Sequence, residues 1–216
     1  MQEEDLGSKQ PFKFFECMNL LQPTGRQAQD LPQLLSLIGE AEPGVIFHHT
    51  HQYYLKAAIE IPEYTNDFAV WAAESLEERA LAEKLASLDL YGCEDVEEVR
   101  NALIRIIKTY LRENPAPRAA RNGDAFFFND AVTIIMEGGP MAGNLHDFIE
   151  ALRTVGASSI YFHFFEARMR LHGPADDFSV WLDQSLGRED LAQRIQRLDP
   201  YHYSLEGLRQ QILSVL

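Results

Sequence analysis

The stretch "NDFAVWAAESLEERALAEKLASLDLY" at residues 66–91 returns later in the chain as "DDFSVWLDQSLGREDLAQRIQRLDPY" at residues 176–201. Between residues 67–91 and 177–201, 11 of 25 positions carry the same residue, and these include both tryptophans, Trp71 and Trp181. A segment that occurs twice in one chain indicates a repeated structural unit. The sequence therefore predicts two copies of one fold.

The likeness continues on both sides of this stretch. Upstream and downstream pairs keep the same chemical character: Leu31, Leu34, Leu35 and Ile38 match Leu145, Phe148, Ile149 and Leu152, and Arg100 matches Arg209. We expect a first repeat over residues 12–112, a Pro-rich polar linker over 113–123 and a second repeat over 124–216, each of about 100 residues. Such copies can pack about a pseudo-two-fold axis, as the subunits of a homodimer do. The first copy carries an insertion in "AAIEIPEYTN", residues 57–66.

Each copy has the apolar spacing of helices. Asp30 and Asn144 are good N-cap residues before segments whose apolar side chains recur at i, i+3, i+4 and i+7. Further helices are expected over roughly 46–58 and 160–170, and after Asn66 and Asp176. The fold class predicted is therefore all-α, with two tandem pseudo-symmetric helical repeats.

The opening segment of each copy is ambiguous. "FKFFECMNLL" at residues 12–21 and "AFFFNDAVTII" at residues 125–135 fit helical spacing, but their aromatic and β-branched content also suits a strand. We predict helices here, and a short extended segment at the start of each repeat is the alternative.

The overall charge excludes some classes of partner. The formal net charge of −14 repels phosphate backbones and anionic lipid, and we expect neither nucleic-acid nor membrane binding. No apolar run is long enough to span a bilayer, and no signal peptide is visible at residues 1–10. With two widely spaced cysteines, Cys17 and Cys93, this favours a cytoplasmic location with free thiols. Cys17 matches the apolar Ala131 of the second copy, which predicts a buried and inert thiol.

Three histidines crowd "VIFHHTHQYY" at residues 45–54 and suggest a metal site built from His48, His49 and His51, with acidic residues nearby in sequence. In the second copy, however, His48 and His51 are replaced by phenylalanines, and only His49 has a histidine counterpart, His163. Because a repeated metal site would keep its ligands twice, we expect a structural histidine in each copy and no metal or other cofactor. Asp67 and Asp177 are the candidate hydrogen-bond partners of these two histidines. Metal binding through the His48/His49/His51 group, with Glu60, Glu63 or Asp67, stays open as an alternative.

The repeated aromatic residues permit two interpretations. Phe and Trp at i and i+3 in "DFAVW" and "DFSVW" are typical of core packing, and we expect both tryptophans to be buried. The alternative is a ligand pocket in each copy, formed by His49, Asp67 and Trp71, or by His163, Asp177 and Trp181. The sequence contains neither a phosphate-binding glycine loop nor a serine-nucleophile elbow.

The order of these motifs resembles an uncharacterised prokaryotic family of unknown function. Members show T-G-x-x-A-x-x-L, then F-H-x, then D-F-x-x-W, then an L-A helix. Thr24, Gly25, Ala28 and Leu31 match the first motif here, whereas the second copy departs from it with Gly138, Gly139, Ala142 and Leu145. The later motifs match in the second copy at His163, Asp177, Phe178 and Trp181. The resemblance covers nearly the whole chain and implies no catalytic residue.

Together these features favour a non-catalytic interaction or regulatory module that binds a protein partner or itself. The alternative is a protein that binds a small molecule, such as a sugar or nucleotide-sugar, or an enzyme accessory to glycan metabolism. No residue pattern assigns a catalytic role.

Overall fold

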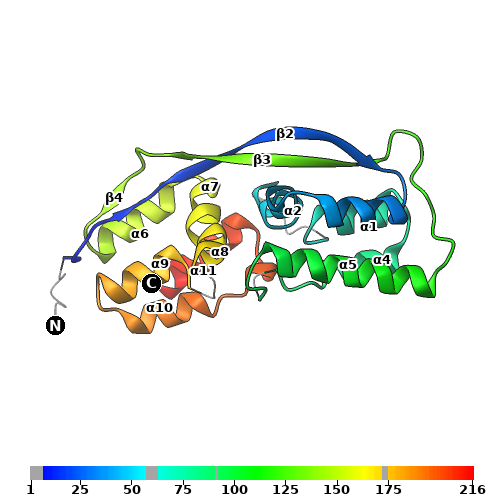
Figure 1. Cartoon of the computed structure of the whole chain (residues 1–216). Coiled ribbons are helices and arrows are strands. Elements are labelled where there is room, and N and C mark those ends of the chain that lie inside the picture. Colours follow the sequence, from blue (N-terminus) through cyan, green and yellow to red (C-terminus); the bar gives the residue numbers. More distant parts are fainter. Residues whose placement is uncertain (1–6, 57–62, 91, 172–174) are drawn as a thin grey trace. The chain divides into compact units, whose positions relative to one another are not determined.

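The computed structural model describes residues 7–56, 63–90, 92–171 and 175–216. Two residues of the sequence analysis, Glu60 and Tyr91, and most of the insertion at 57–66 lie outside these ranges. In order along the chain, the elements are β1 (Phe12–Lys13), β2 (Glu16–Ala28), α1 (Leu31–Glu40), α2 (Pro43–Thr50), η1 (His51–Lys56), α3 (Asp67–Glu74), α4 (Arg79–Ala86), α5 (Val96–Glu113), β3 (Phe126–Met136), β4 (Met141–Ala142), α6 (Leu145–Thr154), α7 (Ala157–Ile160), η2 (Tyr161–Glu166), α8 (Ala167–Arg170), α9 (Asp177–Gln184), α10 (Glu189–Gln196), η3 (Pro200–His202) and α11 (Leu205–Val215) (Figure 1).

The expected all-α fold is wrong, because the structure mixes helices with strands. β1 pairs antiparallel with β4, and β2 pairs with β3 in a second two-stranded sheet. β2 and β3 run in opposite directions along each other in Figure 1. The opening segments that we predicted as helices are thus the strands β1, β2 and β3.

Burial explains why these segments are extended. Phe126 and Phe128 are buried whereas Phe127 between them is more than half exposed, which is the period of two expected of a strand with one covered face. Val132, Thr133, Ile134 and Ile135 follow, and β-branched residues favour extended backbone. The helical spacing of Phe128, Ala131, Val132 and Ile135 was a coincidence.

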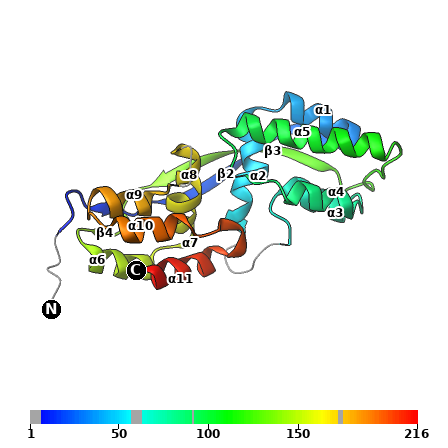
Figure 2. The same ribbon diagram turned by 90° about the horizontal axis from the view of Figure 1, so that it is seen from below.

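The chain divides into two compact units, and each draws residues from both halves of the sequence. By its described residues, unit 1 contains 7–18, 54–56, 133–171 and 175–216, and unit 2 contains 19–53, 63–90 and 92–132. In unit 1 the N-terminal strand β1 lies with the helices α6 to α11, and in unit 2 the start of β3 lies with α1 to α5. Figure 2 shows the paired helices of each unit, α9 with α10 and α3 with α4.

The helices begin where the sequence predicted. Asp30 caps α1 by accepting the backbone N–H of Gln33 at 2.8 Å, and Asn144 caps α6 in the same way through Asp147. Asn66 and Asp176 cap α3 and α9. The second expected helix is a composite: α2 continues into a 3₁₀ turn at η1, and α7 continues through a π-helical turn at η2 into α8.

Both tryptophans are buried, as predicted, with 6% of each exposed. Trp181 stacks on Phe148 with ring centroids 5.0 Å apart and contacts Phe12 of β1 at 5.6 Å. Gly139 lies beside β1, where an added Cβ would come within 2.2 Å of the Phe14 carbonyl oxygen, so only glycine fits there. Among the described residues, no helix combines the length and the apolar character needed to cross a bilayer.

Candidate functional site

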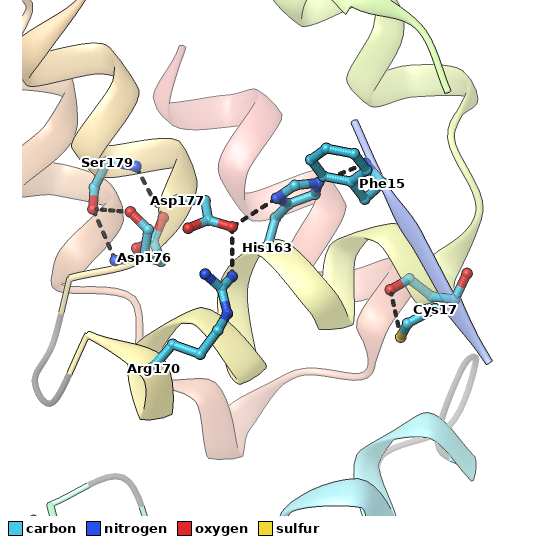
Figure 3. Close-up of polar contacts among 8 residues, drawn as sticks. Phe15, Cys17, His163, Arg170, Asp176, Asp177 and Ser179 are labelled. Carbon is cyan, nitrogen blue, oxygen red and sulfur yellow. Dashed lines mark hydrogen bonds and ion pairs between the residues drawn. The ribbon is translucent and has the colours of Figure 1, made fainter. Parts of the chain in front are cut away.

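In each unit, one histidine ring lies between an aspartate side chain and a backbone segment from the opening part of a repeat. In unit 1, His163 Nδ1 lies 2.8 Å from Asp177 Oδ2, and His163 Nε2 accepts the backbone N–H of Phe15 at 2.8 Å (Figure 3). In unit 2, His49 Nδ1 lies 2.9 Å from Asp67 Oδ2, and His49 Nε2 accepts the backbone N–H of Asn129 at 3.0 Å. Because Nε2 accepts from a backbone donor, the proton of the neutral ring is on Nδ1, where it is donated to the carboxylate.

This arrangement confirms the expected pairing of His49 with Asp67 and of His163 with Asp177. It fixes an extended backbone segment to a buried ring in each unit. Both rings are almost fully buried, and burial lowers the pKa of His163 despite the nearby Asp177 carboxylate. Neither imidazole has a nitrogen left to act as a base or a nucleophile.

The tryptophans fix the same segments at a second point. Trp181 Nε1 donates to the carbonyl oxygen of Gln10 at 2.7 Å, and Trp71 Nε1 donates to the carbonyl oxygen of Asp124 at 2.7 Å. The histidine and tryptophan contacts together match residues 10–15 of unit 1 with residues 124–129 of unit 2, position by position.

A pocket of about 500 Å³ lies beside this contact network in unit 1. Its lining brings together the predicted residues His163, Asp177 and Trp181 with residues that the sequence analysis did not single out: Gln10, Pro11, Phe12, Lys13, Phe15, Phe162, Arg170, Val180, Gln184 and Ser185. Arg170 Nη2 donates to Asp177 Oδ2 at 2.8 Å, and its guanidinium carbon lies 5.0 Å from the centre of the Phe162 ring. The signal that could have found Arg170 is its place seven residues, or two helical turns, after His163.

The residues of the alternative metal site are only partly brought together. Ligand atoms of His48, His49 and Asp67 lie within 4.8 Å of one another, whereas His51 is not in this group. His51 contacts Leu90 O through Nε2 and Thr50 Oγ1 through Nδ1, and burial lowers its pKa to about 4. His48 Nδ1 lies 2.9 Å from Gln52 Oε1, and His49 uses both nitrogens within the protein. A metal at His49 would have to displace Asp67 or the Asn129 amide, so the residues present do not fit a preformed metal centre.

We therefore expect Zn²⁺ to leave the thermal midpoint of the protein unchanged, and dialysis against EDTA to do the same. A ligand that binds only the folded state at 100 times its Kd would stabilise the fold by about 2.7 kcal/mol, which a melting curve resolves easily. His49→Phe is the control, since it removes the ring nitrogens. A rise in midpoint with Zn²⁺ that disappears in this variant would establish the metal site that we reject.

Cys17 is buried, as predicted, and Cys93 is partly buried; both are free thiols. Cys17 Sγ donates to the carbonyl oxygen of Ser158 at 3.6 Å (Figure 3). Burial, with a smaller effect of the Glu166 and Glu16 carboxylates, raises the pKa of Cys17 to about 12. The thiol therefore stays protonated at neutral pH and is a poor nucleophile.

Comparison with known proteins places the chain in a family. The sequence profile of a family of unknown function, DUF5752, matches residues 9–216. The chain belongs to this family. Among solved structures it is similar to OrfY from Thermoproteus tenax, with a TM-score of 0.79 and 34% sequence identity over 98% of this chain and 96% of that chain. No curated protein matches the sequence. The family carries no assigned activity, and these relatives give no specific role.

Proposed function

We propose that this member of the family is a non-catalytic interaction module that binds a second copy of itself through β2 and β3. The observation that carries the proposal is where the exposed apolar side chains lie. Most of the large hydrophobic residues that the described structure exposes belong to these two strands: Met18, Leu20, Leu21, Phe127, Val132, Ile134, Ile135 and Met136. Monomeric proteins rarely concentrate exposed apolar side chains in this way.

Exposure on both faces strengthens this inference. Successive residues of a strand point to opposite faces. Leu20 and Leu21 are 56% and 55% exposed, and Ile134 and Ile135 are 42% and 52% exposed. At these points the sheet is therefore covered on neither face by the described part of the chain.

Part of each strand also offers an open edge without charged side chains to protect it. Among the described residues β2 and β3 pair only with each other, which leaves one edge of each strand open. Residues 17–22 of β2 and 131–136 of β3 carry no charge. Charged side chains are the usual protection of an exposed edge, and their absence favours pairing with another strand. A second copy always supplies a strand of matching sequence, and the resulting contact closes about a two-fold axis.

The state of the histidine and cysteine side chains supports a binding role. Within the described residues, both paired histidines have each nitrogen occupied, and the buried cysteine is held as a thiol. The matched histidine and tryptophan contacts in the two units support the further proposal that the chain arose by an internal duplication. Its cytoplasmic location and prokaryotic origin stay predictions.

The test is the oligomeric state in solution, measured by sedimentation velocity. The wild-type chain is expected to form a dimer, and Ile134→Lys with Ile135→Lys to weaken the dimer by about 100-fold or more, because each lysine would be buried in the contact. Leu171→Lys is the matched control, since Leu171 and Ile134 are equally exposed at 42% and Leu171 lies outside both strands. The dimer is also expected to strengthen with added salt, because each copy carries a net charge of −14. A wild-type protein that sediments as a monomer at all concentrations would refute the proposal.

A further inference from the structure

The pocket of unit 1 differs from the corresponding region of unit 2 in charge. Lys13, Arg170 and Asp177 line it, and the ring of His163 is neutral, so the pocket carries a net positive charge on a chain whose formal charge is −14. By the matched contacts, Phe127 takes the position of Lys13 and Asp124 takes the position of Gln10. By the sequence match of 67–91 with 177–201, Glu74 takes the position of Gln184. At these three positions, unit 1 has one cation and two amides where unit 2 has an aromatic ring and two carboxylates.

The two cationic side chains of the pocket, Lys13 and Arg170, keep N–H groups that can bind a ligand. Among the described residues, Arg170 uses Nη2 for Asp177, and neither its Nε and Nη1 nor Lys13 Nζ has a hydrogen-bond partner. Asp177 Oδ2 accepts hydrogen bonds from Arg170 and His163. These contacts compensate the charge of the carboxylate and leave Oδ1 as an acceptor. The site can therefore bind an anionic group through Lys13 and Arg170, and Asp177 Oδ1 can accept a hydrogen bond from a hydroxyl or amine of the ligand.

Aromatic side chains give the pocket an apolar wall. Phe15 and Phe162 both line it, with ring centroids 6.1 Å apart and the rings nearly perpendicular. Such a wall suits the flat face of a ring, and a volume of about 500 Å³ is ordinary for a small-molecule site.

We propose that this pocket binds a small phosphate monoester that carries a polar ring, with the phosphate on Lys13 and Arg170 and the ring against Phe15 and Phe162. A sugar phosphate and a nucleoside monophosphate share this chemistry. His163 and Trp181 hold the segment that presents Lys13 and Phe15 and are positioning residues of the site, whereas Asp177 orients His163 and also offers Oδ1 to the ligand. The proposal is independent of self-association, which uses other side chains.

The test is calorimetric titration of the full-length protein with glucose 6-phosphate, AMP, inorganic phosphate, glucose and adenosine. At least one of the two esters is expected to bind, and more tightly than both inorganic phosphate and its own neutral parent, glucose or adenosine. Binding of glucose 6-phosphate would indicate a sugar-phosphate site, and binding of AMP would indicate a nucleotide site. Lys13→Ala is expected to weaken that binding about tenfold, the loss expected of one charge-assisted hydrogen bond.

Lys108→Ala is the matched control, because it removes the same charge from α5 of unit 2 and is expected to leave the affinity unchanged. Arg170→Lys tests the role of the guanidinium fork, and a loss of affinity without loss of thermal stability would support direct contact. If neither ester binds at millimolar concentration, or if Lys108→Ala weakens binding as much as Lys13→Ala, the proposal is overturned. Sedimentation of the same variants keeps the two proposals distinct, since Lys13→Ala is expected to leave the dimer intact.

Discussion

Replacing Trp181 by alanine is expected to lower the free energy of unfolding by about 3–5 kcal/mol, the range measured for large aromatic residues truncated in a packed core. The indole is buried, stacks on Phe148 and contacts Phe12, and Phe148 in turn packs against Phe178. Its truncation would leave a cavity next to β1 and also remove the hydrogen bond to the Gln10 carbonyl oxygen. Chemical denaturation monitored by far-UV circular dichroism measures the change.

Two further variants test the cause of this loss of stability. Trp181→Phe keeps most of the ring packing and loses the N–H donor, so its cost is expected to be about 1–2 kcal/mol. Trp71→Ala in unit 2 is expected to match Trp181→Ala, because Trp71 has the same exposure and the same kind of hydrogen bond, to the Asp124 carbonyl oxygen. An unchanged unfolding free energy in Trp181→Ala would show that the side chain is not part of the core.

Part of the fold was predictable from the sequence, and the contacts show why. The helices were predictable because N-cap residues such as Asp30 and Asn144 and the apolar spacing that follows them are local features. Burial of the tryptophans was predictable because two copies of the same motif constrained each other. The pairing of His49 with Asp67 followed from the same comparison.

The choice of strand over helix in the opening segments was not predictable, because the stability of the strands comes from distant residues. Phe15 donates its backbone N–H to His163, and Asn129 donates to His49, across 148 and 80 residues of sequence. No local pattern reports such a contact, and the aromatic residues of these segments fit a helix equally well. The pocket was missed in part for the same reason, since Lys13 and Arg170 come together only when β1 lies on the helices of unit 1.

Asp176, the N-cap of α9, is a buried carboxyl group. Asp176 is fully buried, and its Oδ1 accepts the backbone N–H of Ser179 at 2.9 Å (Figure 3). Its Oδ2 accepts no hydrogen bond from the described residues, and Arg168 Nη2, the cationic atom paired with it, is 3.9 Å away. Burial is the main cause that raises the pKa of Asp176 to about 7; the Ser179 and Arg168 contacts lower it and the neighbouring Asp177 adds a smaller increase.

Unit 2 shows how the same position is satisfied without a charge. There the N-cap is Asn66, which is also fully buried and accepts the backbone N–H of Ala69 at 2.9 Å. Its Nδ2 donates to the carbonyl oxygen of Leu85 at 3.0 Å. The Asn66 amide therefore donates a hydrogen bond to a backbone carbonyl oxygen, which the ionised carboxylate of Asp176 cannot do.

We expect Asp176→Asn to stabilise the protein at pH 8 and to have little effect at pH 4. The folded-state pKa of Asp176 is above its unfolded value of about 3.9, so the folded protein binds the proton more tightly and stability falls as the pH rises through about 7. A shift of this size corresponds to at most about 4 kcal/mol at pH 8, and the asparagine variant is expected to recover a large part of it. Unfolding curves of both proteins between pH 4 and pH 8 measure the difference.

Asn66→Asp is the matched control and is expected to introduce the same loss of stability with rising pH into unit 2. Parallel pH profiles for the wild type and Asp176→Asn would contradict the prediction, because they would mean that the Asp176 carboxyl titrates alike in the folded and unfolded chain.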